Sequence, residues 1–272
     1  MFATAPLRVQ AFAGSHTGRV RAENEESFVV ANLSEGVRIE ANGVLRFRSG
    51  RYGSLFAVAD GMGGAAAGEM ASRLCVRTVY REVQELIREI RQPSEGLLEE
   101  ILIEAVASAN SRIYDLARSN HEFAGMGTTL TMVLELGGRL LIGQIGDSRA
   151  YLLRQGQIRQ LTRDQSLIGQ RVSEGEITEE EGRRHPERNI LLQAVGVRPA
   201  VELALKSIAL QGGDVLLLCS DGLHSQMSAQ EIFDVAAESA GPEDACESLI
   251  VLANHRGGPD NITAVLVQFL FE

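Results

Sequence analysis

Apolar and polar residues alternate along this chain with two periods, one typical of strands and one typical of helices. Residues 55–59 are all apolar and lead into Asp60 and a glycine-rich turn, which predicts a buried strand whose last side chain reaches the sheet edge. From Ala65 to Arg91 apolar residues recur every three or four positions, and the same spacing returns after Pro93. The pattern therefore predicts a strand followed by two amphipathic helices.

Most of the remaining chain consists of short apolar or alternating runs separated by turn residues. Asn42-Gly43 lies within an alternating stretch and predicts a hairpin over residues 37–47. Because successive strands joined by tight turns form antiparallel sheets, we expect an antiparallel arrangement. Strands are predicted at residues 9–16, 27–33, 37–47, 128–136, 139–146, 149–153, 157–161, 201–208, 215–220 and 262–269.

Residues 162–196 interrupt this pattern, because they are polar, helix-prone and poor in large apolar side chains. Thr178 followed by three glutamates fits a helix capping box, and we expect the whole segment to be a surface excursion from the sheet. The chain shows no linker, repeat or change of composition. We therefore predict a single domain over residues 1–272, of class α+β, in which two antiparallel β-sheets flanked by pairs of helices form a four-layer αββα sandwich.

The composition and net charge argue against several classes of function and location. The 272 residues carry a net charge of −10, so neither nucleic acid nor an anionic membrane is the expected partner. No apolar stretch approaches the roughly eighteen residues that cross a membrane. Cys75, Cys219 and Cys246 lie far apart in apolar stretches, which favours buried thiols in a reducing compartment over disulfides or a zinc site. We therefore expect a cytoplasmic protein.

Four aspartates stand where predicted strands end or begin. Asp60, Asp147 and Asp221 follow apolar runs, and Asp260 precedes the last run. Any one of them could simply break a strand, since aspartate is a common turn residue. Four aspartates in equivalent positions at strand ends favour one shared site. Because like charges repel one another, such a site implies divalent metal between the carboxylates.

The turn after Asp60 also fits a dinucleotide-binding fingerprint, because residues 61–66 have the pattern G-x-G-x-x-A between a strand and a helix. Three features oppose that interpretation. The carboxylate of Asp60 would abut a pyrophosphate, no acidic residue closes a second strand about twenty residues later, and two helices precede the next strand. We therefore favour the metal site.

Six short motifs follow one another along the chain. They are GRVRAENEES at 18–27, DGMGG at 60–64, GTT at 127–129, GDSRA at 146–150, SDGL at 220–223 and DNIT at 260–263. Together they resemble the metal-dependent serine/threonine protein phosphatases of type 2C, in particular the bacterial members. The resemblance covers about residues 9–269 and implies the same αββα sandwich that the hydrophobic pattern predicts.

The resemblance implies a dinuclear centre of Mn²⁺ or Mg²⁺. Asp60 would bridge the two ions, the Gly61 carbonyl would bind one of them, and Asp221 and Asp260 would complete the shell of the first ion. Two such ions acidify a bridging water and stabilise its in-line attack at phosphorus, so that no covalent phosphoenzyme is needed.

The same resemblance gives roles to four further residues. Glu25 and Glu26 would hold the second ion mostly through water, and Asp147 would belong to a weaker third metal site. Arg21 would clamp the phosphate oxygens of the substrate, which a guanidinium can do bidentately. The alternative for Arg21 is a solvated surface arginine.

The chain departs from the family pattern at three positions. Glu26 stands where the pattern usually has aspartate, which places the carboxylate one methylene farther out. Met62 replaces a histidine of the animal members but is usual in bacterial ones, and Gln165 stands where bacterial relatives commonly carry histidine. The excursion over residues 162–196 corresponds to the flap of the family, which is thought to influence substrate choice.

The expected activity is hydrolysis of phosphoserine and phosphothreonine in proteins, which would be substrates of a serine/threonine kinase in signal transduction. We expect a monomer. Two alternatives remain open, a metal-free regulatory or binding module of the same fold and a dinuclear hydrolase of another phosphoester such as a nucleotide. The aspartates that a metal-free relative would lack are all present.

Overall fold

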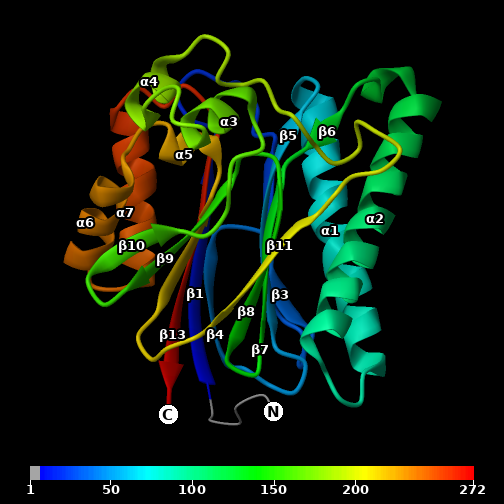
Figure 1. The fold of residues 1–272 in the computed structure, drawn as a ribbon, viewed down its shortest axis with the longest axis vertical. Helices are drawn as coiled ribbons and strands as arrows, with labels where there is room; N and C mark the ends of the chain where they lie inside the picture. Colours follow the sequence, from blue (N-terminus) through cyan, green and yellow to red (C-terminus); the bar gives the residue numbers. More distant parts are fainter. Residues whose placement is uncertain (1–6) are drawn as a thin grey trace.

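The computed structural model describes residues 7–272 of the chain. Within these residues, two antiparallel β-sheets pack face to face, and helices cover the outer face of each sheet (Figure 1). The predicted four-layer αββα architecture is therefore confirmed.

The strands divide between the sheets without following their order in the chain. The first sheet has the order β10-β9-β12-β13-β1-β4, and the second has the order β11-β8-β7-β5-β2-β3 with β6 paired to β5. The strands of the first sheet are β1 (Leu7–His16), β4 (Gly43–Arg48), β9 (Arg149–Arg154), β10 (Gln157–Gln160), β12 (Val215–Cys219) and β13 (Ile262–Phe271). The strands of the second sheet are β2 (Glu26–Asn32), β3 (Val37–Ile39), β5 (Ser54–Met62), β6 (Gly127–Thr128), β7 (Leu130–Leu136), β8 (Arg139–Ile145) and β11 (Ala204–Ala209).

Strand β5 lies at the centre of the second sheet and is buried on both faces. Phe56 and Val58 face the other sheet, where Phe56 meets Phe269 of β13 edge to face with 6.1 Å between ring centroids. Leu55 and Ala57 point the opposite way, into the core beneath the helices. Burial on both faces explains why residues 55–59 are continuously apolar instead of alternating.

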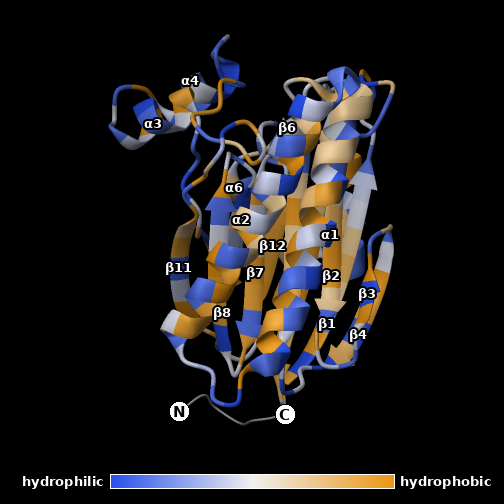
Figure 2. Ribbon diagram, turned by 90° about the vertical axis from the view of Figure 1, so that its right-hand side faces the viewer, coloured by the Kyte–Doolittle hydropathy of each residue, from blue (hydrophilic) through white to orange (hydrophobic). Residues whose placement is uncertain are grey.

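Helices α1 (Ala65–Glu89) and α2 (Glu95–Ser119) lie side by side over the second sheet, with the short η1 (His121–Phe123) after them (Figure 2). Helices α6 (Ala229–Glu238) and α7 (Pro242–His255) cover the first sheet, preceded by the short α5 (Asp221–His224). No helix within residues 7–272 combines the length and the apolar character needed to cross a membrane.

The segment between β10 and β11 forms an excursion at one end of the sandwich (Figure 1). It contains α3 (Leu167–Ser173) and α4 (Glu179–Arg184) and contributes no strand to either sheet. Thr178 and Glu181 form the predicted capping box at the start of α4. We call residues 162–196 the flap.

The predicted hairpin around Asn42-Gly43 is wrong. Strand β3 pairs with β2 in the second sheet, whereas β4 pairs with β1 in the first, so the connection crosses between sheets. Asn42 does not close a hairpin turn, because its side chain bonds the backbone of Ser15, with Ser15 N donating to Oδ1 at 2.9 Å and Nδ2 donating to the Ser15 carbonyl at 3.1 Å. Alternation of polar and apolar residues shows which face of a strand is buried but does not identify its partner.

Candidate metal centre

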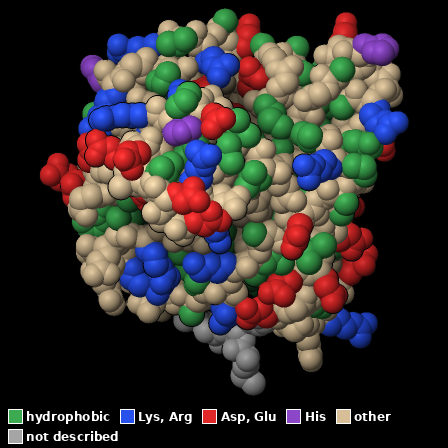
Figure 3. Space-filling model, turned by 45° about the horizontal axis from the view of Figure 1, so that its top comes forward, with side chains coloured by type: hydrophobic (Ala, Val, Ile, Leu, Met, Phe, Trp, Pro, Cys, Tyr) green, Lys and Arg blue, Asp and Glu red, His purple; other side chains and the backbone are tan. Residues whose placement is uncertain are grey.

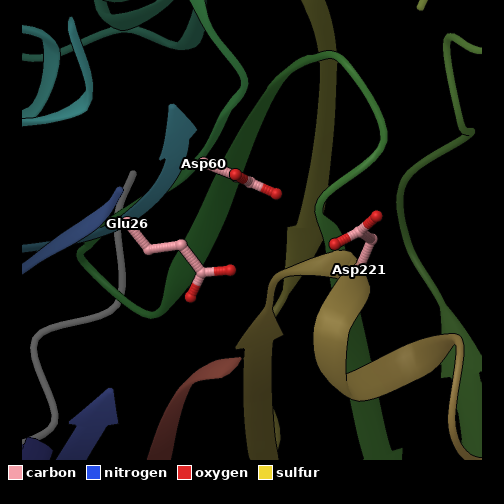
Figure 4. Close-up of side chains that lie close together, drawn as sticks. All are labelled: Glu26, Asp60 and Asp221. Carbon is pink, nitrogen blue, oxygen red and sulfur yellow. The ribbon is translucent and has the colours of Figure 1, made fainter. Parts of the chain in front are cut away.

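Three carboxylates from three elements converge at one end of the sandwich. Glu26 begins β2, Asp60 lies near the end of β5, and Asp221 begins α5 directly after β12. An oxygen from each lies within 4.8 Å of an oxygen from both others. Figure 4 shows the three side chains pointing into one shared space.

This cluster carries more negative charge than its surroundings can stabilise. Glu26 is only 7% exposed, and among the described residues neither of its carboxylate oxygens has a hydrogen-bond partner, nor does Oδ1 of Asp221. The hydroxyls of Ser220 and Thr263 lie near enough to Glu26 to favour its charged form, but not in hydrogen-bond geometry. Buried carboxylate oxygens without partners are rare and costly, so they call for a proton or a cation.

The pKa values of these carboxylates reflect the same unfavourable concentration of negative charge. Burial, followed by the charges of Asp221 and Asp260, raises the pKa of Glu26 to about 8. Burial and then the charge of Glu26 raise the pKa of Asp60 well above its ordinary value. Burial and then Asp260 raise the pKa of Asp221 to about 6. Mn²⁺ and Mg²⁺ prefer oxygen ligands, and a divalent ion would offset the repulsion between closely spaced carboxylates. The residues present therefore fit a divalent ion.

The backbone of Asp60 is fixed by the neighbouring Gly-Thr-Thr segment. Asp60 N donates to Thr129 Oγ1 at 3.0 Å, and the Asp60 carbonyl accepts from Thr129 N and from Thr128 Oγ1, each at 2.9 Å. The Asp60 carboxylate is therefore held by a rigid strand edge.

Gly61 and Gly68 allow strand β5 and helix α1 to touch. A methyl group on Gly61 would lie 2.0 Å from the Gly68 carbonyl oxygen, and one on Gly68 would lie 1.9 Å from Glu25 Oε2. The Glu25 carboxylate therefore lies against this glycine contact, where burial raises its pKa and the charge of Arg21 opposes the shift. Only glycine permits so close an approach of the two backbones.

Asp260 pairs with Arg21. Arg21 Nη2 lies 2.8 Å from Asp260 Oδ2, and both side chains are partly exposed. The neighbouring Asn261 ties this corner together, since its Oδ1 accepts from Glu25 N at 2.8 Å and its Nδ2 donates to the carbonyl of Glu23 at 2.9 Å. Sequence reasoning assigned no role to Asn261, although it lies within the DNIT motif.

Asp147 follows β8 on the other side of the cluster and is buried. Burial and then the charge of Asp221 raise its pKa well above the ordinary value, while Arg149 opposes the shift. Asp147 is not one of the three mutually close carboxylates, but it lines the same cavity as Asp60 and Asp221. This arrangement places it at the border of the cluster.

A cavity of about 220 Å³ opens over these groups. Seven of the eight site residues predicted from sequence line it, and Glu26 is the exception. The seven are Arg21, Glu25, Asp60, Gly61, Asp147, Asp221 and Asp260. Acidic and basic side chains are interspersed on the face that includes this end of the molecule (Figure 3). The cavity can therefore present both metal-ligating oxygens and a cation to an anionic ligand.

The carboxylates of Glu25 and Glu26 lie against different groups, and the expectation that both hold the second ion stays a prediction. Glu25, which precedes β2, has its Oε2 against Gly68, whereas the carboxylate of Glu26, the first residue of β2, lies near those of Asp60 and Asp221. The geometry groups Glu26 with Asp221, the ligand expected for the first ion.

Comparisons with known proteins agree with this geometry. The family described as "Protein phosphatase 2C" matches residues 44–255. A putative protein phosphatase 2C-type of Streptococcus pyogenes serotype M6 is 40% identical over 216 residues, which cover 79% of this chain and 85% of the relative. The structure of the S. agalactiae serine/threonine phosphatase matches with a TM-score of 0.82 and 31% identity, covering 97% of this chain and all (100%) of the other. The catalytic domain of the serine/threonine protein phosphatase PstP in complex with two manganese ions matches with a TM-score of 0.78 and 36% identity, covering 97% of this chain and 99% of the other.

Proposed function

The chain belongs to the protein phosphatase 2C family of metal-dependent serine/threonine phosphatases, and from this we propose how its own residues carry out the hydrolysis. Asp60, with Glu26 and Asp221 beside it, would hold one divalent ion, and Asp260 would complete that set. Asp60 would also contact a second ion, with Gly61 and Glu25 on that side. When bound, Mn²⁺ or Mg²⁺ ions acidify water and stabilise the charge that develops on phosphoryl oxygens.

Arg21 is the residue that we assign to the phosphate. It lies in the cavity wall, and its side chain is 46% exposed although one amino group is bonded to Asp260. The planar guanidinium has five N–H donors, so the pair with Asp260 leaves others free for phosphoryl oxygens. Asp260 thereby orients Arg21 over the carboxylate cluster.

Direct attack by water is supported by the state of the nearby thiol. Cys219 ends β12 beside the cluster, but it is fully buried and burial raises its pKa above the ordinary thiol value. A thiol that stays protonated is a poor nucleophile. The hydroxyl of Ser220 is also engaged, since it accepts a hydrogen bond from Thr263 N at 3.0 Å. Neither group is suited to form a covalent phosphoenzyme.

The relatives are serine/threonine phosphatases, so phosphoproteins are the substrate class. We further propose that these are products of a serine/threonine kinase and that residues 1–272 act as one monomeric catalytic domain with the flap at 162–196. Three buried free cysteines support a reducing compartment such as the cytoplasm.

One observation carries the proposal, namely that the carboxylates of buried Glu26 and half-buried Asp60 and Asp221 share a space, while the Glu26 carboxylate has no hydrogen-bond partner within residues 7–272. A metal-free binding module has no need for such a cluster, because the repulsion would destabilise it. The same observation does not distinguish phosphoproteins from other phosphoesters, so the test must compare substrates.

The test measures phosphate release from a phosphoserine peptide, a phosphothreonine peptide and a nucleoside monophosphate, each with Mn²⁺, with Mg²⁺ and with EDTA. We expect hydrolysis of both peptides with either ion, little hydrolysis of the nucleotide, and none with EDTA. Hydrolysis that persists in EDTA contradicts the metal centre. Preference for the nucleotide contradicts the protein substrate.

A further inference from the structure

The turn 146–148, which carries Asp147, is held at its backbone carbonyls by side chains of Gln144, at the end of β8, and of the distant His224. Gln144 Nε2 donates to the carbonyls of Gly146 and Ser148, each at 2.8 Å. His224 Nε2 lies 3.0 Å from the Asp147 carbonyl. A turn whose carbonyls are satisfied in this way holds its carboxylate in one position.

Gln165, at the start of the flap, makes three contacts with this same turn and the strand before it. Its Oε1 accepts from Gly146 N at 3.0 Å, and its backbone N donates to the Gly146 carbonyl at 2.9 Å. Its Nε2 donates to the Gln144 carbonyl at 3.3 Å. The first residues of the flap and the Asp147 turn are therefore bonded as one unit.

Gln165 also reaches the end of the flap. Its carbonyl accepts from Leu192 N at 2.8 Å, and its Oε1 accepts from Gln193 Nε2 at 3.1 Å. Gln193 is itself bonded to the backbone of Glu202 just before β11, through its Nε2 at 2.7 Å and its Oε1 at 2.8 Å. One side chain thus connects the entry of the flap, its exit and the Asp147 turn.

We propose that Gln165 is a positioning residue that couples the flap base to Asp147, so that the position of the flap base sets the affinity of the ion that Asp147 helps to hold. This inference rests on the third-site role that the family resemblance implies for Asp147, which lines the same cavity as Asp60 and Asp221. Groups that orient metal ligands through hydrogen bonds typically change metal affinity or activity by about 10–100-fold when removed. Gln165 does not line the cavity over the carboxylates, so its effect would pass through the Gly146 amide.

The neighbourhood of Gln165 offers a matched control. Gln165 and Gln170 line the same cavity of about 500 Å³ between the flap and β11, so a leucine at either position has room. Gln170 Nε2 bonds only Glu174, within and just after α3, and makes no contact with the turn. Gln165→Leu removes the side-chain bonds of Gln165 to Gly146, Gln144 and Gln193 and leaves its two backbone bonds in place. Gln170→Leu removes a glutamine of the same segment whose side chain bonds only Glu174 among residues 7–272.

Four proteins are compared, the parent, Gln165→Leu, Gln170→Leu and Gln165→His, which retains a ring nitrogen able to accept from Gly146 N. Titration calorimetry with Mn²⁺ measures ion affinity without reference to activity. Hydrogen exchange at the Gly146 amide reports the side-chain contact, and exchange at the Leu192 amide, which bonds the Gln165 carbonyl, reports whether the two ends of the flap stay together. Peptide hydrolysis at saturating Mn²⁺ gives kcat and KM.

We expect Gln165→Leu to weaken the weakest Mn²⁺ site at least tenfold and to speed hydrogen exchange of the Gly146 amide. Gln170→Leu should match the parent, and Gln165→His should regain most of the Mn²⁺ affinity. Parental Mn²⁺ affinity in Gln165→Leu overturns the proposal, and so does a lowered melting temperature with unchanged Mn²⁺ binding, since that denotes a structural role only. Because calorimetry and exchange do not depend on hydrolysis, failure of the proposed phosphatase reaction would be recognised separately in the parent.

Discussion

Glu26 of β2 and Asp60 of β5 are directly opposite one another in the antiparallel pairing of the second sheet. Like charges at directly opposed positions destabilise a sheet. Here the two carboxylates also share their space with Asp221, and within residues 7–272 neither carboxylate oxygen of Glu26 has a hydrogen-bond partner. A pairing that is unfavourable for folding is well suited to binding a cation, and this relationship underlies the first two predictions.

Asp60→Asn should lower Mn²⁺-dependent turnover by orders of magnitude while the fold remains intact, because the amide removes the charge at the centre of the cluster. The same change relieves the repulsion with Glu26, so in EDTA the variant should melt no lower than the parent. Turnover on a phosphopeptide and thermal unfolding in EDTA measure both effects. Near-parental activity would show that Asp60 does not hold the ions.

Glu26→Ala should weaken Mn²⁺ binding by about 10–100-fold, because the variant loses one of the three carboxylates that share the site. Glu26→Asp retains a carboxylate and should bind as well as the parent or more tightly, since aspartate has one fewer rotatable bond. Calorimetry compares the three proteins. If alanine binds like the parent, Glu26 has no role in the site; if aspartate is as weak as alanine, the local backbone is adapted to glutamate.

Arg21→Ala should raise KM for a phosphopeptide by about tenfold or more, since a charge-assisted hydrogen bond contributes roughly 1.5–3 kcal/mol. Arg21 is bonded to Asp260, which is one of the expected metal ligands. Its removal frees that carboxylate, so Mn²⁺ affinity should not fall. Steady-state kinetics and calorimetry test the two statements, with Arg21→Lys as the charge-retaining control. Weaker Mn²⁺ binding at an unchanged KM would refute the phosphate role.

Gly68→Ala in helix α1 should impair the metal site. The added methyl would meet Glu25 Oε2 at 1.9 Å and the Gly61 carbonyl carbon at 3.0 Å, so both the Glu25 carboxylate and strand β5 must shift. We expect at least a tenfold loss of Mn²⁺-dependent turnover, because a displacement of about 1 Å in a site can cost roughly 10²-fold.

Gly96→Ala in α2 is the matched control for Gly68→Ala, because nothing lies within 4 Å of a methyl group there. It should keep parental turnover and raise stability by about 0.4–1 kcal/mol, as alanine favours a helix. Equal activity of the two variants would contradict the close contact between α1 and the site.

Glu135 gives a pH-dependent prediction remote from the site. Burial raises its pKa above the ordinary 4.5, and hydrogen bonds from Ser49 and Ser54 offset only part of the shift. The folded protein therefore keeps this proton to a higher pH than the unfolded chain, and stability is lost as pH rises above 4.5 toward the folded pKa. Glu135→Gln cannot ionise, so its stability relative to the parent, measured by urea unfolding, should increase as the pH rises above 4.5.

Glu231→Gln should show the opposite sign. Arg256 and the backbone of Ser228 lower the Glu231 pKa to about 2, so its contribution is present above the ordinary 4.5 and is lost as pH falls toward 2. The glutamine variant should therefore be less stable than the parent near neutral pH, with the difference shrinking in acid. The same sign for both variants would contradict these assignments.

The sequence predicted those features of the site that depend on residues close together in the chain. Asp60 and Asp221 could be predicted as partners because both end apolar strands, and strand ends gather at sheet edges. The division between Glu25 and Glu26 could not be predicted, because it depends on the register of β2 against β5. The Arg21–Asp260 pair joins residues 239 positions apart, and no local pattern encodes that contact.

The sequence by itself determined the elements, the αββα class and the set of acidic residues, because hydrophobic period and turn chemistry act over a few neighbouring residues. Tertiary structure alone decided that β3 and β4 lie in different sheets, since a strand pattern leaves its partner open. It also decided that Gln165 joins the flap to the Asp147 turn, through an amide whose partners lie 19 and 28 residues away. Such contacts depend on how packed layers bring distant segments together, and this information is not present in any short stretch of the chain.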